Sequence, residues 1–488
     1  MFRLPFKVHI VTGLLAACVA GPAFAQWSSD PSANLSIADR SNEQAQPKIA
    51  PTADGGFYVS WFDNSTGGYD VYLQRLDAAG NEQWPHNGIL VADRDFSSTQ
   101  DYGLDVDADG NALLAFRLDD ASQIPQIEAQ KIAPDGTLQW GSGGIIVSDD
   151  SGGANSPKIT ATGDGTAVVA WSSSDGAIVA QKLDGDGVPL WGPTGVSIEP
   201  AGGFFFLADL HGDADGNAIV SWGAQPTFGD NQMWAQKLAA ADGGNLWGTD
   251  PVVVSDDSDG VLQFGNFPPF VPDGSGGAVF VWYTVTTTGS VHAQHILADG
   301  SAAFAQNGVQ ASTNTTRGHY EPAGAWDATT GDIYAVWRET NSLQTSFGVF
   351  AQRIDSSGSR QWGDNGKTIV PLGATDQSHM DAQPLAGGVL ALWVSSDSPN
   401  PMPIHVARID ADGSYAWPGN FVDIKTAATD TTRVAGALSS NGYAAWAWTD
   451  DDASFAGDVK AQNINFDGTL GVAAPDDVIF ADGFDGAP

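Results

Sequence analysis

Two short segments of the sequence combine side chains that could perform acid–base chemistry on a sugar. They read Arg-Gly-His-Tyr-Glu over residues 317–321 and His-Met-Asp over residues 379–381. An arginine can neutralise a uronate carboxylate while a histidine or tyrosine moves the proton, as a polysaccharide lyase requires. The candidate catalytic residues are therefore Arg317, His319, Tyr320, Glu321, His379 and Asp381.

The same two segments admit two other interpretations. His319, His379 and a carboxylate could ligate a metal ion, since imidazole and carboxylate groups are common zinc ligands. Alternatively, all of these residues are solvated loop side chains, and this is the interpretation that we favour. The sequence contains no Gly-x-Ser-x-Gly, His-Glu-x-x-His, P-loop or dinucleotide-binding motif, so it does not indicate serine hydrolase, zincin or nucleotide chemistry.

Alternating aspartates form a candidate calcium site. Asp105, Asp107 and Asp109 precede Gly110, which matches the first half of a calcium-binding loop. The twelfth position of that loop is Phe116 rather than glutamate, so the full motif is absent. A tight hairpin turn explains the same residues, because aspartate and glycine suit its backbone. We favour the turn, keep calcium as the alternative, and expect no other cofactor.

The aromatic side chains fall into two groups. Those that recur once per repeat, described below, are expected to pack between repeats. Those that do not recur could complete the core, which we favour, or stack against a carbohydrate. The non-recurring aromatics are Phe204, Phe205, Phe206, Trp234, Phe264, Phe267, Phe270 and Trp326.

A repeat of about 55 residues must position all of these side chains. Its first anchor is an aromatic residue that ends an apolar segment, and this residue is found at Trp61, Phe116, Trp171, Trp222, Trp282, Trp337, Trp393 and Trp448. Its second anchor is usually a glutamine after alanine, and it is found at Gln74, Gln130, Gln181, Gln236, Gln294, Gln352, Ala407 and Gln462. Two independent anchors thus define eight copies.

Each copy contains four strand-length segments, and no segment shows helical periodicity. This pattern predicts an all-β protein, an eight-bladed β-propeller of four-stranded antiparallel blades over residues 26–475. The last copy lacks its fourth strand, whereas residues 26–39 match that strand as it occurs after Trp84. We therefore expect residues 26–39 to complete the last blade and close the ring, which removes exposed sheet edges. An open solenoid is the alternative.

One face of such a propeller should carry the binding site. Two kinds of segment should meet at one mouth of the central channel: the crossings into the first strand of each blade, and the loops between the second and third strands. The copies of the repeat differ most in these segments. We expect binding there, and a structural role for repeated residues such as Gln74 and Trp84. The candidate ligand-binding residues at this mouth are Lys48, Tyr102, Lys158, His211, Arg338 and Arg433.

The repeat resembles that of secreted bacterial β-propeller proteins, in which Gly-Gly-x-Trp, Ala-Gln-Arg-x-Asp and Trp-x-x-Asn-Gly segments recur. The resemblance covers nearly all of residues 26–475. It implies a propeller-type surface protein, a class generally without an assigned activity, and it transfers no catalytic residue. Residues 478–485 are also similar to a short C-terminal motif of exported proteins from Gram-negative bacteria, and they lie in an acidic tail at 476–488.

The N-terminus and the net charge bear on location and partners. Residues 1–25 join two basic residues, an apolar run and a small-residue cleavage site before Gln26, which predicts a secretory signal peptide. A lipoprotein modified at Cys18 is the alternative. No other segment is long and apolar enough for a transmembrane helix. With 20 Lys+Arg against 58 Asp+Glu, the chain should repel nucleic acid and anionic membranes.

These observations together predict an extracellular or periplasmic monomer that binds a glycan or another protein. The predicted fold depends on eight copies of a repeat, whereas the catalytic candidates depend on two short segments, and a fold alone does not define an activity. We therefore favour a binding or surface-interaction module whose ligand is a carbohydrate. A carbohydrate-active enzyme with lyase-like chemistry at the channel mouth is the alternative.

Overall fold

The structure is a computed structural model that describes residues 26–94, 102–120, 122–148, 153–198, 204–226, 229–256, 258–263, 267–396, 402–451 and 456–472. The predicted signal peptide at 1–25, with Cys18, and the acidic tail at 476–488 lie outside these residues. Export and lipidation therefore stay predictions. Within the described part of the chain, no helix is long and apolar enough to cross a membrane.

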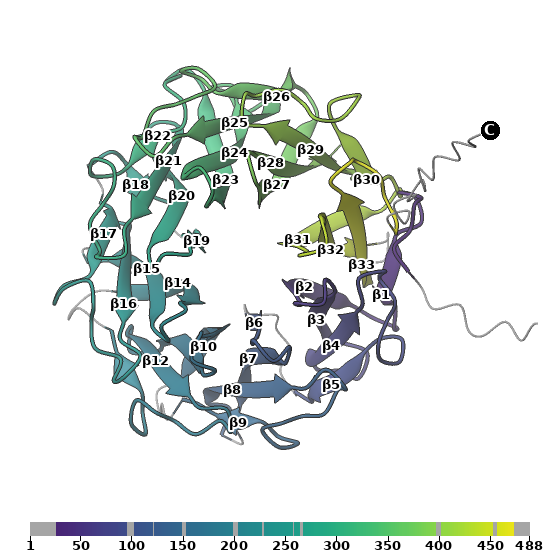
Figure 1. Ribbon diagram of the computed structural model, residues 1–488, viewed down its shortest axis with the longest axis vertical. Helices are drawn as coiled ribbons and strands as arrows, with labels where there is room; N and C mark the ends of the chain where they lie inside the picture. Colours follow the sequence, from purple (N-terminus) through teal and green to yellow (C-terminus); the bar gives the residue numbers. More distant parts are fainter. Residues whose placement is uncertain are drawn as a thin grey trace, which may run out of the picture.

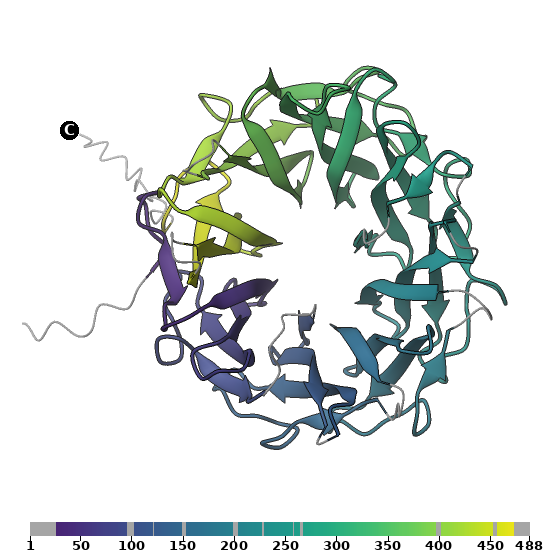
Figure 2. The same ribbon diagram turned by 180° about the vertical axis from the view of Figure 1, so that it is seen from behind.

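Eight antiparallel sheets surround a central channel, which confirms the predicted eight-bladed propeller (Figures 1 and 2). The first strand of each blade lies at the channel and the last lies at the outside (Figure 1). The strands of blades one to four are β2 (Gln44–Pro51), β3 (Phe57–Asp63), β4 (Asp70–Leu76) and β5 (Ile89–Ala92); β6 (Gly103–Val106), β7 (Ala112–Asp119), β8 (Pro125–Ile132) and β9 (Ile145–Ile146); β10 (Ala154–Ala161), β11 (Ala167–Ser173), β12 (Ile178–Leu183) and β13 (Val196–Ser197); β14 (Phe204–Gly212), β15 (Ala218–Gln225), β16 (Gln232–Leu238) and β17 (Val252–Ser255).

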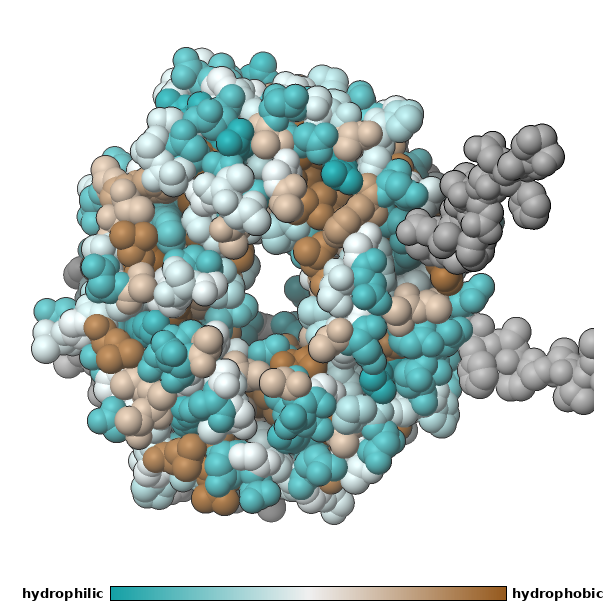
Figure 3. Space-filling view, in the orientation of Figure 1, coloured by the Kyte–Doolittle hydropathy of each residue, from teal (hydrophilic) through white to brown (hydrophobic). Residues whose placement is uncertain are grey.

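The strands of blades five to eight follow the same order. They are β18 (Val261–Leu262), β19 (Phe270–Pro272), β20 (Ala278–Val285), β21 (Gly289–Ile296) and β22 (Val309–Gln310); β23 (Gly318–Asp327), β24 (Asp332–Thr340), β25 (Phe347–Ile354) and β26 (Lys367–Gly373); β27 (Asp376–Leu385), β28 (Gly388–Ser396), β29 (Ile404–Asp410) and β30 (Val422–Lys425); β31 (Asp430–Leu438), β32 (Tyr443–Asp451), β33 (Gly457–Asn465) and β1 (Leu35–Ala38). A hole passes through the centre of the molecule (Figure 3).

The second strand of each blade is the most deeply buried. β3 reads Phe-Tyr-Val-Ser-Trp-Phe-Asp, and every one of its residues is buried. Both faces of a blade pack against neighbouring blades, so a continuous apolar run replaces the alternating pattern of a half-exposed strand. The strand-two aromatics at the first anchor of the repeat, from Trp61 to Trp448, are accordingly buried.

The repeated glutamine links the third strand of a blade to the fourth. In blade three, Gln181 Nε2 donates to the carbonyl of Gly192 at 2.7 Å, and Oε1 accepts from the backbone N–H of Trp191 at 3.0 Å. Equivalent pairs of bonds occur in blades one, two, four, five and six. A buried amide is stable only when both of its polar groups are paired. The glutamine is therefore a structural residue.

A tryptophan just before the fourth strand joins each of five blades to the next by an indole hydrogen bond. The indole N–H of Trp191 donates to the carbonyl of Ala240 in blade four at 3.2 Å. Gly243 follows in the same turn with φ +73°, and a Cβ there would lie 3.0 Å from the Trp191 ring. Both the left-handed backbone and this close contact require glycine.

The ring is closed by the N-terminal strand, as predicted. β1 pairs antiparallel with β33 in the eighth blade. Trp27 takes the place of the missing strand-four tryptophan and packs on Gly80 of the first blade. Gln462 Nε2 donates to the carbonyl of Ser28 at 2.6 Å, which repeats the bond of Gln181 in blade three. The last blade thus keeps the Nε2 bond of the repeated glutamine, while Gln462 Oε1 accepts from Asn34 Nδ2 at 3.1 Å.

Blade five differs from the other blades in its innermost strand. That strand is divided into β18 and β19, which pair with opposite ends of β20. Of the residues between the two pieces, the described ones, 263 and 267–269, lie outside the ladder. This interruption matters for the site described next, because it places an aromatic side chain over blade four.

Candidate functional site

The predicted acid–base residues lie on or beside β23 and β27, the innermost strands of two adjoining blades (Figure 1). The two strands place these side chains in different surroundings. Some are enclosed between blades, and others remain at the channel.

His319 is enclosed by its own blade. The side chain is 2% exposed, and its ring lies edge-on to Trp337 with centroids 5.9 Å apart. Its Nε2 lies 3.5 Å from Oε2 of the buried Glu339, and Arg317 Nη1 lies 3.5 Å from Oε1 of the same carboxylate. Burial, followed by the charge of Arg317, lowers the pKa of His319 to about 4. The expectation that His319 acts on a substrate in the channel is corrected, because the ring is out of reach.

Tyr320 and Asp381 connect neighbouring blades. The Tyr320 hydroxyl accepts a hydrogen bond from the backbone N–H of Gly289 in blade five at 3.2 Å. Asp381 Oδ2 accepts from the indole N–H of Trp446 in blade eight at 2.5 Å and from Gln383 Nε2 at 2.9 Å. These contacts give both side chains structural roles in place of the predicted catalytic ones.

Glu321 and His379 remain at the channel. Arg338 holds Glu321 at 3.2 Å and Asp376 at 2.5 Å, and thereby joins blade six to blade seven. His379 is half-buried, and its Nδ1 lies 3.0 Å from the Ser378 hydroxyl. Burial, and then the charge of Arg433, lowers the pKa of His379 below its usual value.

The predicted ligand-binding residues also separate. Tyr102 is fully buried, with its hydroxyl 2.8 Å from the Ser60 hydroxyl and 3.1 Å from the carbonyl of Gln46, so its predicted binding role is corrected. Lys48 lies over the Tyr102 ring at 5.2 Å. His211 Nε2 lies 3.1 Å from a carboxylate oxygen of Asp209. Burial lowers the pKa of His211, but the charge and hydrogen bond of Asp209, together with the charge of Asp105, raise it overall.

The three aspartates of the candidate calcium loop do not converge. Asp105 accepts a hydrogen bond from the backbone N–H of Ala161 in blade three at 2.8 Å, whereas Asp107 pairs with Lys131 at 2.8 Å. The backbone N–H of Asp109 donates to Asp107 at 3.0 Å, as in a tight turn. No group of three His, Cys, Asp or Glu side chains in the described ranges could hold a metal ion. This arrangement supports the turn and corrects both metal interpretations.

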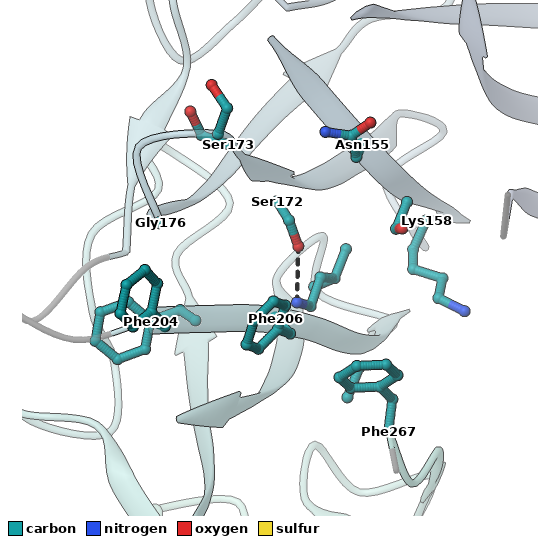
Figure 4. A pocket seen from close by; sticks show the side chains of 13 residues that line it. Asn155, Lys158, Ser172, Ser173, Gly176, Phe204, Phe206 and Phe267 are labelled. Carbon is teal, nitrogen blue, oxygen red and sulfur yellow. Dashed lines mark hydrogen bonds between the residues drawn. The ribbon is translucent and has the colours of Figure 1, made fainter. Parts of the chain in front are cut away.

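A cavity of about 500 Å³ lies between the innermost strands of blades three and four (Figure 4). One wall is the start of β14, where side chains alternate between the two faces of the strand. Phe204 and Phe206 therefore face the cavity, and Phe204 is 64% exposed. Phe205 points the other way and packs on Trp234, with centroids 6.1 Å apart.

The interrupted strand of blade five supplies a third ring to this cavity. Phe267 lies in the break between β18 and β19 and is 43% exposed. Its ring lies beside that of Phe206, with centroids 5.9 Å apart (Figure 4). Packing in the core is thus corrected for Phe204, Phe206 and Phe267 and confirmed for Phe205 and Phe270, while Phe264 lies outside the described residues.

The opposite wall of the cavity is polar. It consists of the start of β10 and the turn after β11, with side chains of Asn155, Ser156, Lys158, Ser172, Ser173 and Ser174. The Ser172 hydroxyl accepts a hydrogen bond from the backbone N–H of Leu207 at 2.9 Å and so ties the two walls together (Figure 4). Lys158 was predicted from the sequence as a ligand-binding residue, whereas the asparagine and serines were not. The other sequence signals for this site are the Phe run at 204–206 and Phe267 before two prolines.

No protein-family model and no curated protein matches the chain. Solved structures do resemble it. The Dos1 propeller has 12% identity and a TM-score of 0.47, covering 91% of this chain and 96% of its own. An ulvan lyase has 11% identity and a TM-score of 0.44, covering 89% and 96%. The α-L-arabinanase of Penicillium chrysogenum has 11% identity and a TM-score of 0.39, covering 89% and 99%. Similarities of this size assign no activity to the chain.

Proposed function

We propose that the protein is a carbohydrate-binding β-propeller whose ligand occupies the cavity between blades three and four. The observation that carries this proposal is a cluster of three rings at the cavity, of which Phe204 and Phe267 are exposed and Phe206 is half-buried. Large apolar side chains are normally buried, and an exposed cluster in a cavity is typical of a binding site.

The chemistry of the cavity matches a sugar. A sugar ring has apolar faces formed by C–H groups and polar edges formed by hydroxyls. Phe206 and Phe267 can stack on the faces, while Asn155, Ser156 and Lys158 on the opposite wall can bond the hydroxyls.

The lyase alternative has less support. Of the side chains predicted to exchange protons, His319 is enclosed in its blade and Tyr320 is bonded between blades. A general acid or base must come within hydrogen-bond distance of the substrate proton. We therefore do not assign a reaction to the protein.

Alanine substitution in the cavity tests the proposal. Wild type should bind at least one polysaccharide of an immobilised plant and bacterial glycan panel. Phe206→Ala and Phe267→Ala should each weaken that binding roughly tenfold, since a buried ring contact contributes on the order of 1.5 kcal/mol. Affinity electrophoresis with the best polysaccharide measures the change.

Phe421→Ala is the matched control. Phe421 is 40% exposed but lies outside the cavity, against Trp393 and His405 of blade seven. Its substitution should leave glycan binding unchanged. The proposal fails if wild type binds no glycan of the panel, or if both cavity variants bind as wild type does.

A further inference from the structure

The innermost strands of five blades share a bulge at the same position. In β2, two residues, Gln46 and Pro47, stand opposite the single residue Trp61 of β3, and the register skips in the same way in β10, β23, β27 and β31. The first residue of each bulge has a left-handed backbone with φ between 50° and 56°. These residues are Gln46, Ser156, Glu321, His379 and Arg433.

None of these five positions holds glycine. A left-handed backbone costs a residue with a side chain roughly 1 kcal/mol or more, and glycine removes that cost. The chain has 59 glycines and places them at left-handed positions in its turns, such as Gly187 and Gly243. The bulges instead carry five different side chains. This suggests that each side chain has a role which glycine could not fill, and that the role differs between blades.

The bulge also explains where these side chains lie. A bulge re-aims the side chain of its extra residue away from the regular faces of the sheet. On a strand that lines the channel, the free direction is the channel itself. Glu321 and Arg433 are exposed, whereas the residues on either side of each are only half-buried, and His379 is half-buried. Ser156, in turn, lines the cavity of blades three and four.

The charges differ around this ring of bulge residues. Glu321 and Asp376 are paired with Arg338, and Asp381 accepts from Trp446. Among the residues that the structure describes, no carboxylate lies within ion-pair distance of Arg433. An exposed arginine with no carboxylate partner among the described residues is unusual in a chain with net charge -38. β27 and β31 are neighbours, so His379 and Arg433 adjoin each other around the channel.

We propose that Arg433 and His379 form a second binding site, on the channel wall between blades seven and eight, for an anionic group of a sugar ligand. The Arg433 guanidinium can donate two parallel hydrogen bonds to a carboxylate or sulfate. A ring N–H of His379 can add a third. The site is separate from the aromatic cavity and does not need it to be occupied.

Glycine substitution isolates the side chains from the fold. Arg433→Gly and His379→Gly keep a backbone that glycine adopts freely, so the melting temperature should be unchanged or higher. Affinity for polygalacturonate should fall at least tenfold in Arg433→Gly and less in His379→Gly, because the charged donor contributes more. Isothermal titration at low ionic strength measures both affinities.

Arg360→Ala is the control for net charge. Arg360 follows the turn between β25 and β26, on the opposite face from the channel mouth, and its carboxylate partner Asp364 is 3.8 Å away. Its removal changes the charge as Arg433→Gly does, and it should leave polygalacturonate binding unchanged. An equal loss in both variants would overturn the proposed site in favour of a general charge effect.

Three polymers identify the group that is bound. Polygalacturonate carries carboxylates, dextran sulfate carries sulfates, and dextran is neutral. Loss in Arg433→Gly of binding to either charged polymer supports the site and names its ligand. The proposal is overturned if wild type binds neither charged polymer, or if Arg433→Gly binds both as wild type does. Phe206→Ala separates the two proposals, because it should weaken neutral glycan binding whether or not the anion site exists.

Discussion

The two faces of the propeller use their repeated positions in opposite ways. On the face of the strand-three turns, six blades repeat the same glutamine bonds, and glycine and tryptophan form the same contact between blades. At the channel mouth, five blades share one backbone bulge but fill it with five different residues. The first face is uniform because each copy must solve the same folding problem. Under the proposed function, the second varies because a ligand would present a different group to each blade.

The energetics of the two faces differ in the same way. The glutamines, and tryptophans such as Trp191, are buried and hydrogen-bonded, so each contributes to stability. The mouth residues are exposed or strained, so they contribute little or reduce stability. Substitution should therefore separate the faces, with stability lost from one and binding lost from the other.

The largest expected effect is that of a tryptophan between blades. Trp191→Ala removes a buried ring and its hydrogen bond to Ala240, and should lower the free energy of unfolding by about 3–5 kcal/mol. Phe206→Ala, at the mouth, should lower it by less than about 1 kcal/mol, because the ring is partly solvated. Urea unfolding followed by tryptophan fluorescence measures both. Equal losses would contradict the division between the faces.

One buried position does not follow this division. Two residues before the repeated glutamine, opposite the strand-two aromatic, the copies carry different side chains, including Tyr72, Glu128, His292 and His405. His292 stacks on Trp282, with centroids 5.6 Å apart. Glu128 is 4% exposed, and burial raises its pKa to about 7.

Glu128 should therefore make stability depend on pH. Its pKa is higher in the folded chain than in the unfolded chain, so the folded state retains a proton that the unfolded state releases between about pH 4.5 and pH 7. The free energy of unfolding should fall as pH rises through this range, by about 2 kcal/mol for this group. The Glu128→Gln side chain cannot ionise. Between pH 5 and pH 8, the free energy of unfolding of this variant should therefore fall by about 2 kcal/mol less than that of wild type. Urea unfolding of wild type and of Glu128→Gln at pH 5 and at pH 8 measures this difference. An identical pH dependence in the two proteins would contradict the role of Glu128.

The smallest effect is expected where glycine and a side chain exchange places. Gln46→Gly relieves a left-handed backbone and should change the free energy of unfolding by less than about 1 kcal/mol. Gly187→Ala places a Cβ at φ +83° and 2.9 Å from Ile145, and should cost about 2 kcal/mol. Thermal unfolding of the pair measures the difference. A larger loss from Gln46→Gly than from Gly187→Ala would show that the bulge side chain stabilises the fold.

The fold could be predicted because the sequence contains eight copies of one repeat. The spacing of Gln74, Trp84 and their counterparts defines the blade, and the missing last strand identifies the N-terminal segment as its replacement. The site could be predicted only in part. The chain order does not reveal that β18 and β19 break apart and bring Phe267 against Phe206, nor that His319 turns into its blade, since both depend on packing between blades.

The bulges illustrate why the sequence repeat alone does not predict the residues at the channel mouth. Gln46-Pro47, Ser156-Pro157 and Glu321-Pro322 are visible in the sequence as a residue before proline, which is typical of an extended backbone. The left-handed conformation of the first residue arises from the pairing with the neighbouring strand, and that pairing is a property of the assembled blade.

The closure of the ring has a consequence for how the chain reaches its final shape. Leu35 of β1 stands opposite Ala461 of β33. The first strand to be synthesised therefore cannot pair until β33 has also been synthesised. The other seven blades can form from neighbouring segments, whereas the eighth requires the longest-range pairing in the molecule and is expected to form slowest. A chain that stops short of β33 leaves β1 unpaired and one sheet edge open, which is a template for aggregation. Because the eighth blade contains both ends of the propeller sequence, the ring can close only after the whole propeller sequence has been synthesised.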